Sequence, residues 1–151
     1  MSGMASPIMK LISRLAGLFV LVPLLVLLIR GHLFSRSPLV ILGQSVSVAL
    51  LLWARVSFHQ GQFRVVPAPA GGPMLIRGPY RFLRHPMYAG ALLLLWSSVL
   101  GHWSAVYGAF ALAALPAVAV RIKDEERALR EHYPEYTQYQ RMTKRLIPYL
   151  F

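Results

Sequence analysis

The residues best suited to chemistry form two short groups in the second half of the chain. The first group lies between Gly78 and Gly90 and contains Arg84, His85 and Pro86. Proline suits the first turn of a helix and forces the residue before it out of the helical region, so His85 precedes a helix N-terminus. Free backbone N–H groups beside basic side chains favour an anion such as a carboxylate or phosphate. The competing interpretation is an interfacial membrane anchor made of arginine, tyrosine and a helix-starting proline.

The second group contains Arg121 and three adjacent acids, Asp124, Glu125 and Glu126. Arg121 and Glu125 are four residues apart, so they share one face of a helix. Acids at the point where a helix leaves a membrane oppose the usual preference for basic residues, and a cationic ligand explains them. The competing interpretation is a solvated salt bridge worth about 0.3–0.5 kcal/mol.

Composition indicates a membrane as the surroundings of both groups. The 151 residues are 56% apolar and only 14% charged, and the formal net charge is +11. Soluble domains contain about 45–50% apolar and about 25% charged residues, which argues against a soluble cytosolic enzyme. The basic residues stand singly between apolar runs, so they fit anionic lipid headgroups better than nucleic acid. The chain has no cysteine, which excludes disulfides, thiolate catalysis and cysteine metal sites.

Uncharged runs predict membrane-crossing helices, because a charge at the bilayer centre costs about 2.5–3.5 kcal/mol on insertion scales. The run from 85 to 120 is too long for one helix across a hydrocarbon core of roughly 30 Å, so it must turn back near residues 101–104. We expect an all-α membrane protein with one domain over 1–151, about four transmembrane helices, a long loop and a C-terminal amphipathic helix. The expected spans are about 11–30, 37–55, 86–101 and 104–121.

Basic residues also predict which side of the membrane each segment occupies. Only Arg30 and Arg36 fall on the side opposite the termini and the loop 57–84, so the positive-inside rule places the termini and this loop in the cytoplasm. A cleaved signal peptide is the competing interpretation of the N-terminus, since Lys10 and Arg14 precede an apolar stretch. No small-residue cleavage site follows before Arg30, and further spans come after it.

The motifs and their order resemble the isoprenylcysteine carboxyl methyltransferase family and its relatives among phospholipid N-methyltransferases. The resemblance covers about residues 74–148, half of the chain. It rests on these pieces in sequence: Gly78-Pro79-Tyr80, then Arg84-His85-Pro86-Met87-Tyr88-Ala89-Gly90, an uncharged helical hairpin, Glu125-Glu126, and Arg145-Leu146-Ile147-Pro148.

The resemblance implies an integral, multi-pass membrane methyltransferase that uses S-adenosylmethionine, with its active site facing the cytoplasm. It implies a lipophilic or prenylated methyl acceptor in the lipid bilayer, with no nucleic acid and no metal. Arg121 matches an arginine that contacts a carboxylate acceptor, so it is the candidate catalytic and substrate-binding residue. The residues matched to the cofactor pocket are Met74, Leu75, Tyr80, His85, Pro86, Met87, Tyr88, Gly90, Glu125 and Glu126.

The chemistry of the residues agrees with this cofactor. S-adenosylmethionine carries a sulfonium, an ammonium and a carboxylate, so its pocket needs acids at one end and hydrogen-bond donors at the other. Methyl transfer to a carboxylate needs no general base, whereas an amine must first lose a proton and Arg121 repels its charged form. A carboxylate acceptor is therefore favoured. The alternatives are a phospholipid N-methyltransferase and a noncatalytic membrane accessory protein on the same scaffold.

Overall fold

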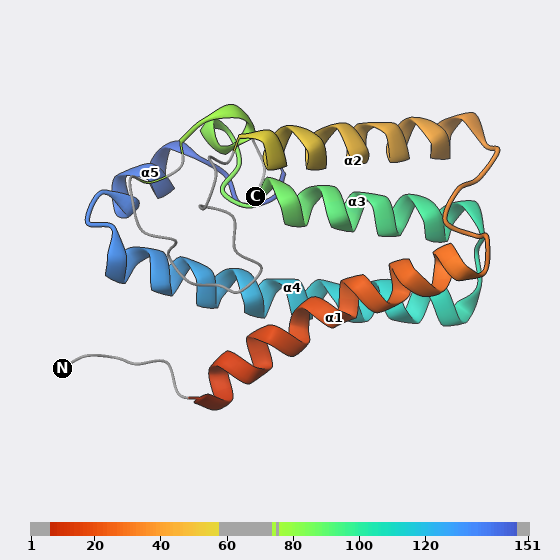
Figure 1. Cartoon of the computed structure of the whole chain (residues 1–151), viewed down its shortest axis with the longest axis horizontal. Helices are drawn as coiled ribbons and strands as arrows, with labels where there is room; N and C mark the ends of the chain where they lie inside the picture. The colour runs from red at the N-terminus through yellow and green to blue at the C-terminus, as the bar shows by residue number, and fades with distance from the viewer. Residues whose placement is uncertain (1–6, 58–73, 75, 148–151) are drawn as a thin grey trace.

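The fold is known from a computed structural model, which describes residues 7–57, 74 and 76–147, with side chains in the first helix from Gly17 onward. Leu75, one of the predicted cofactor residues, lies outside the described residues. The described part is helical and contains no β-strand, only one isolated parallel bridge, so the all-α prediction is confirmed. Its elements are α1 (Pro7–Ile29), α2 (Pro38–Val56), η1 (Gly78–Arg81), α3 (Pro86–Gly101), α4 (Ala105–His132) and α5 (Tyr136–Met142), where η1 is a 3₁₀-helix (Figure 1).

Local sequence explains where the long helices begin. Pro38 and Pro86 occupy the first turn of α2 and α3, where the missing N–H of proline costs no helical hydrogen bond. Ser104 precedes α4, and its hydroxyl accepts a hydrogen bond from the backbone N–H of Tyr107 at 3.2 Å. Gly31 follows α1 with a φ of +69°, a left-handed conformation that glycine adopts without strain.

One helix differs in extent from the prediction. The expected fourth span, 104–121, and the amphipathic helix expected after it form a single helix, α4, that continues to His132. No proline or glycine interrupts the chain between Val120 and His132, so nothing breaks the helical hydrogen bonds where the charged residues begin. The charged second half of α4 therefore extends rigidly beyond its uncharged first half.

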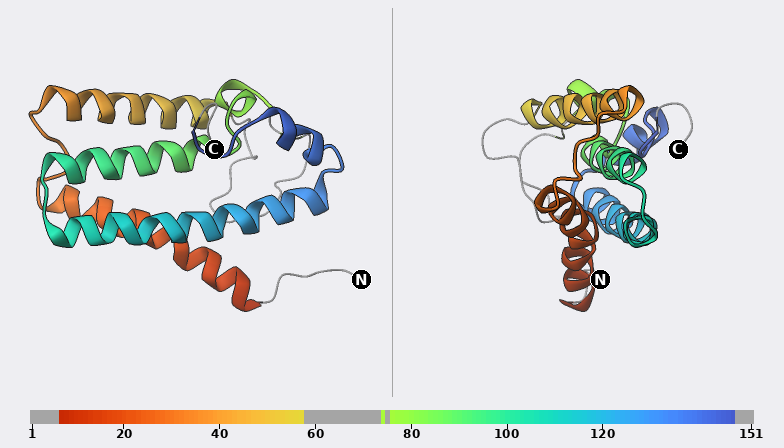
Figure 2. Two further views of the ribbon diagram at one scale, coloured as in Figure 1. Left: turned by 180° about the vertical axis from the view of Figure 1, so that it is seen from behind. Right: turned by 90° about the vertical axis from the view of Figure 1, so that its right-hand side faces the viewer.

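The four long helices pair in a definite order. α2 packs mainly against α3, α1 packs mainly against α4, and α3 and α4 contact each other between them. α1 crosses α4 obliquely, and its N-terminal end diverges from the other helices (Figures 1 and 2). The charged end of α4, η1 and α5 gather at the same end of the bundle, opposite the α1–α2 and α3–α4 connections (Figure 1).

The pairing of α2 with α3 depends on small and polar residues. The hydroxyl of Ser47 donates to the carbonyl of Gly90 at 2.6 Å, and a Cβ at Gly90 would lie 2.8 Å from Cγ of Leu51. Farther along, the Gln44 side chain donates to the hydroxyl of Ser98 at 3.2 Å. Small residues let two backbones approach closely, and interhelical hydrogen bonds of this kind stabilise helix pairs inside membranes.

Apolar side chains cover much of the outside of the bundle. Leu39 and Ile29, for example, are 78% and 75% exposed. Two helices, Pro38–Val56 and Ala105–His132, are long and apolar enough to cross a membrane, and the shorter segments Gly17–Ile29 and Pro86–Gly101 are also apolar. The described part of the chain therefore contains two membrane-capable helices, and crossing by all four stays a prediction.

Candidate functional site

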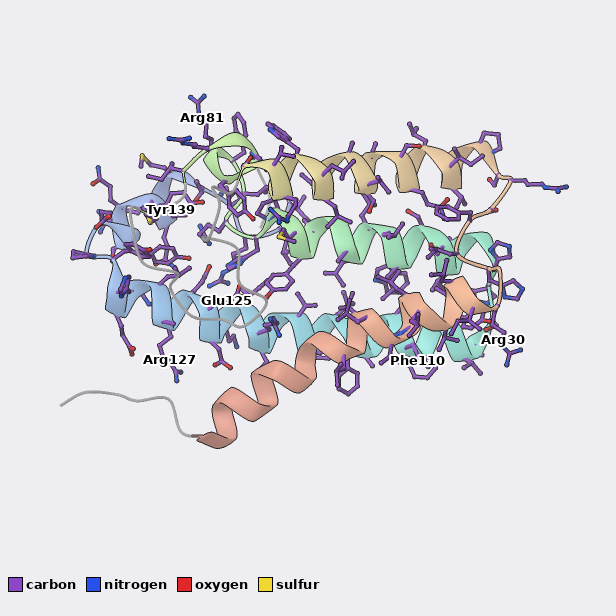
Figure 3. All side chains as sticks on the ribbon, in the orientation of Figure 1. Arg30, Arg81, Phe110, Glu125, Arg127 and Tyr139 are labelled. Atoms are coloured by element: carbon purple, nitrogen blue, oxygen red, sulfur yellow. The ribbon has the colours of Figure 1, made fainter. Side chains whose placement is uncertain are left out.

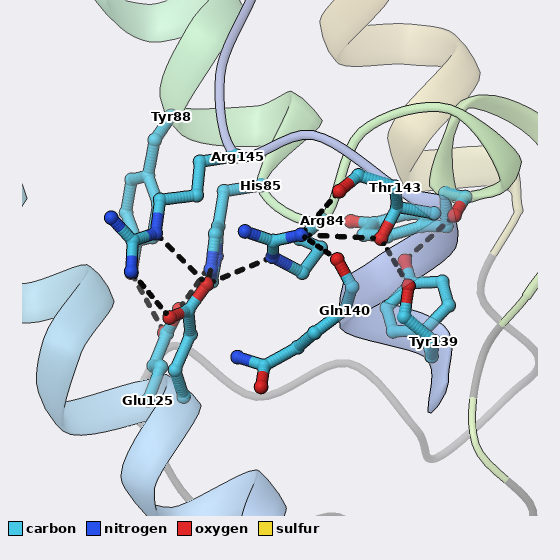
Figure 4. A network of polar contacts seen from close by, with 10 residues as sticks. Arg84, His85, Tyr88, Glu125, Tyr139, Gln140, Thr143 and Arg145 are labelled. Atoms are coloured by element: carbon cyan, nitrogen blue, oxygen red, sulfur yellow. Dashed lines mark hydrogen bonds and ion pairs between the residues drawn. The ribbon is translucent and has the colours of Figure 1, made fainter. Parts of the chain in front are cut away.

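The two groups of reactive residues meet at the charged end of the bundle. His85 stands just before α3, and its imidazole lies between two carboxylates of α4 (Figure 4). Its Nδ1 is 3.4 Å from Oε2 of Glu125, and its Nε2 is 3.5 Å from Oε1 of Glu126. The fold thus brings together side chains about forty positions apart in the sequence.

Glu125 belongs to a chain of hydrogen bonds that also includes Arg121. The hydroxyl of Tyr88 donates to Oε1 of Glu125 at 2.7 Å and accepts from Nε of Arg121 at 2.5 Å. The Arg121 guanidinium also lies 5.8 Å from the centre of the Tyr88 ring, within the range of a cation–π contact. Tyr88 therefore connects the arginine and the acid that the sequence places one helical turn apart.

Arg121 is enclosed between helices. The residue is only 7% exposed, and on its α1 side a Cβ added at Gly17 would lie 3.0 Å from Nη1 of the guanidinium. Glycine at this position lets α1 approach the arginine closely. A buried guanidinium is costly unless it is paired, so its place in the packed interior marks it as more than a solvated surface charge.

Glu126 differs from its neighbour Glu125 in its surroundings. The Glu126 side chain is 1% exposed, against 22% for Glu125. Its carboxylate accepts from Nε of Arg84 at 2.9 Å and lies 3.3 Å from Nη2 of Arg145. Burial raises the pKa of Glu126, but hydrogen bonds from His85, Arg84 and Arg145 outweigh burial and lower it to about 2. Glu126 is therefore ionised at neutral pH.

The same carboxylates determine the charge of His85. Burial lowers the pKa of the imidazole, but the adjacent Glu125 and Glu126 raise it by more, so it lies above its ordinary value of 6.5. An imidazolium donates from both nitrogens, and here each nitrogen faces a carboxylate. The two carboxylates therefore favour the protonated, cationic form of His85.

Several contacts in this cluster were absent from the sequence-based prediction. Arg84, expected to favour a bound anion, instead donates to Glu126 and, through Nη1, to the backbone carbonyls of Gln140 and Thr143. The sequence marked Arg145 as the first residue of the last motif in the family resemblance, but nothing in the sequence indicated that Glu126 is its partner. No motif or spacing in the sequence indicated a contact by Thr143.

The remaining predicted residues lie around the cluster at different depths. Tyr80 is buried, and its carbonyl accepts from the hydroxyl of Tyr139 at 2.6 Å. Burial, with the nearby charge of Glu125, raises the pKa of Tyr80, so its phenol stays neutral. Met74 and Met87 are half-buried, and Pro86 is buried. Gly90 lies in the contact between α2 and α3, apart from the charged residues.

Two buried oxygens at this end are without hydrogen-bond partners among the described residues, Asp124 Oδ2 and Tyr136 Oη, and His85 Nε2 has only its long ion-pair contact with Glu126. Buried polar groups in folded proteins are normally paired, so a water molecule or a polar ligand is the expected partner of such atoms. In the part of the chain that the structure describes, no three His, Asp or Glu side chains are placed to hold a metal ion.

The fold and the site define a helical protein with membrane-capable helices and a buried, charged site at one end. The family model for phospholipid methyltransferase matches residues 39–136, so the chain belongs to this family of membrane methyltransferases. The match confirms the family resemblance, and it includes His85, Tyr88, Arg121 and the Glu125–Glu126 pair. No curated protein and no solved structure matches the chain.

Proposed function

We propose that this protein transfers a methyl group from S-adenosylmethionine to an anionic group of a lipophilic acceptor, first of all a carboxylate like that of a prenylated cysteine. The observation that carries the proposal is the buried Arg121 guanidinium, joined through the Tyr88 hydroxyl to Glu125. A fixed, buried cation beside an accessible acid provides separate places for an anionic acceptor and a cationic methyl donor.

The residues present fit S-adenosylmethionine by their chemistry. When bound, S-adenosylmethionine supplies a methyl group activated by its sulfonium and retains the electron pair of the broken carbon–sulfur bond. Glu125 is the more exposed acid and offers a charged partner for the donor's ammonium or its ribose hydroxyls. The unpaired hydroxyl oxygen of Tyr136 gives a further polar contact. Tyr80, Pro86, Met87 and Tyr88 supply the aromatic and apolar surroundings.

The charge of the cluster favours an anionic acceptor. Three arginines, Arg84, Arg121 and Arg145, outnumber the two carboxylates of the Glu pair, and the pKa of His85 is raised beside them. Transfer of a methyl cation to a carboxylate reduces charge on both partners, and this reaction requires no base. Burial and alignment then supply the acceleration: the helices exclude water, and Arg121 holds the acceptor oxygen in place.

A second candidate is methylation of the nitrogen of an aminophospholipid, which the name of the family favours. Arg121 is able to bind the phosphate of such a lipid as well as a carboxylate. An ammonium must lose a proton before it attacks, however, and the two carboxylates beside His85 favour its protonated form, which is not a base. The geometry supports the carboxylate acceptor better.

The proposal includes a topology: one domain over 1–151 that crosses the membrane four times, with α1 and α3 as the two additional spans. Arg121 and the acids after it then lie on the cytoplasmic side, because basic residues are concentrated on the segments at this end of the bundle. A lipophilic acceptor reaches such a site from the cytoplasmic leaflet.

The direct test is methyl transfer by the purified protein in detergent micelles. Radiolabelled S-adenosylmethionine is supplied with either a prenylcysteine analogue or phosphatidylethanolamine, and cofactor binding is measured separately by calorimetry. Label in the prenylcysteine analogue supports the proposal, and label in phosphatidylethanolamine alone supports the second candidate. Absence of cofactor binding by the folded protein would contradict both and favour a noncatalytic accessory protein.

A further inference from the structure

The C-terminal segment is paired with the loop that carries His85. The backbone N–H of Lys144 donates to the carbonyl of Phe82 at 3.0 Å, and the N–H of Arg84 donates to the carbonyl of Lys144 at 2.7 Å. The N–H of His85 then donates to the carbonyl of Arg145 at 3.0 Å. These bonds form a short parallel ladder, so residues 143–147, here called the strap, fix the backbone immediately before α3.

Arg84 anchors the strap from its inner side. Its side chain is 9% exposed, and the guanidinium donates to the backbone carbonyls of Gln140 and Thr143 and to the Glu126 carboxylate (Figure 4). The carbonyl of Gln140 is among those at the end of α5 that lack partners within the helix. A planar guanidinium with several fixed donors is suited to such a multiple contact, which a lysine cannot reproduce.

Glu126 is saturated by protein groups. Its Oε1 accepts from Nε of Arg84 at 2.9 Å and lies 3.5 Å from Nε2 of His85, and its Oε2 accepts from Arg145 at 3.3 Å. The side chain is almost completely buried. Glu125, the residue before it, is more exposed, and its carboxylate is contacted by Tyr88 and His85.

We propose that the two acids have different roles: Glu125 contacts the ligand, whereas Glu126 and Arg84 are positioning residues that hold the strap and the His85 loop together. Successive residues on a helix point about 100° apart, so adjacent acids reach different surroundings. Here one faces the site and the other faces the strap. The ligand assigned to Glu125 rests on the proposed function, whereas the strap contacts do not.

The test compares two isosteric substitutions at adjacent positions, Glu126→Gln and Glu125→Gln, in the full-length protein in detergent. Amide hydrogen exchange is measured on peptides covering 143–147 and 82–85, and S-adenosylmethionine affinity is measured across pH. We expect Glu126→Gln to accelerate exchange of the Lys144 amide at least about tenfold. Glu125→Gln is expected to leave this exchange unchanged and to weaken cofactor binding at least about tenfold.

Affinity across pH separates positioning from general destabilisation. Glu126 favours the protonated form of His85, so in Glu126→Gln the pH above which cofactor affinity declines is expected to move to a lower value. A loss of stability alone leaves this pH unchanged. Unaltered exchange in Glu126→Gln, together with a loss of affinity equal to that of Glu125→Gln, would overturn the proposal and make both acids ligands.

Arg84→Lys provides a second variant if Glu126→Gln does not fold, because it retains the positive charge. Lysine cannot span Glu126 and the two carbonyls, so we expect the same acceleration at the Lys144 amide, and unchanged exchange would contradict the strap assignment. Wild-type protein that binds no S-adenosylmethionine refutes the proposed function. The exchange measurements still decide whether Glu126 and Arg84 hold the strap.

Discussion

Replacement of Arg121 by alanine tests most directly whether this arginine serves the acceptor and not the cofactor. The guanidinium is buried, is bonded to the hydroxyl of Tyr88 and lies against Gly17 of α1. Among the predicted cofactor residues, it donates to the Tyr88 hydroxyl, and Tyr88 keeps its own hydrogen bond to Glu125 when Arg121 is removed. We therefore expect Arg121→Ala to leave S-adenosylmethionine affinity within about threefold of the wild type, less than about 0.7 kcal/mol.

Methyl transfer is expected to fall much further. A hydrogen bond between a charged donor and its partner contributes about 1.5–3 kcal/mol, and the buried Arg121 guanidinium falls within that range. Each 1.4 kcal/mol corresponds to a factor of ten, so kcat/KM for the acceptor should decrease by about tenfold to a hundredfold. The assay measures label transfer at saturating cofactor and varied acceptor, beside calorimetric cofactor binding.

Arg127→Ala is the matched control, because it removes the same charge from the same helix at an exposed position. Figure 3 shows Arg127 pointing away from the bundle, on the side of α4 opposite the neighbouring helices, whereas Glu125 points toward them. Transfer and cofactor binding should both stay near wild-type values in Arg127→Ala. Equal losses of cofactor affinity and of transfer in Arg121→Ala would refute the reasoning, since Arg121 would then belong to the cofactor pocket or to the fold.

Four other predictions concern the cofactor, the backbone, pH and topology. Glu125→Gln should raise the Kd for S-adenosylmethionine about tenfold, or about 1.4 kcal/mol, by calorimetry; an unchanged Kd would reduce Glu125 to a structural ion-pair member. Gly78→Ala should destabilise the fold by at least about 1–2 kcal/mol in thermal unfolding, because φ at Gly78 is +55°; unaltered unfolding would show that the loop relaxes. The pKa of Glu126 is lowered from 4.5 to about 2 in the folded protein, so the ionised carboxylate contributes fully to stability above about pH 4.5 and progressively less as pH falls toward 2. The unfolding temperature of Glu126→Gln should therefore decrease less than that of the wild type over this pH interval. A cysteine at Ser35 should react with a membrane-impermeant reagent in intact cells, whereas one at Thr137 should react only after lysis, and labelling of Thr137 from outside would reverse the topology.

The sequence predicted the helices because their determinants are local. Long uncharged runs require helical backbone in a membrane, and Pro38, Pro86 and Ser104 mark the starts of three helices. The sequence predicted a span to 121 and an amphipathic helix after it, and the structure joins the two as one continuous helix to His132. Charge changes the surroundings of a helix without breaking its hydrogen bonds, so the helix extends through it.

Which residues far apart in the sequence contact each other depended on tertiary structure. The sequence identified His85 and the Glu125–Glu126 pair as members of one site, and the structure brings them together. It assigned both acids to the cofactor pocket, however, and distinguished Glu125 only by the helix face that it shares with Arg121. Their difference in burial arises only where α4 meets the strap.

The sequence by itself determined the helical class, the family and the set of charged residues that gather at one end. Hydrophobic periodicity, the length of the uncharged runs and the order of the motifs are all properties of the sequence that do not depend on tertiary contacts. Tertiary structure alone decided the partners of these residues. Arg84 and Arg145 donate to Glu126, and Tyr88 connects Arg121 with Glu125. Glu125 is also the more exposed of the two acids. A side chain on a helix can face several neighbours, and its partner is fixed only when packing brings one of them within hydrogen-bonding distance.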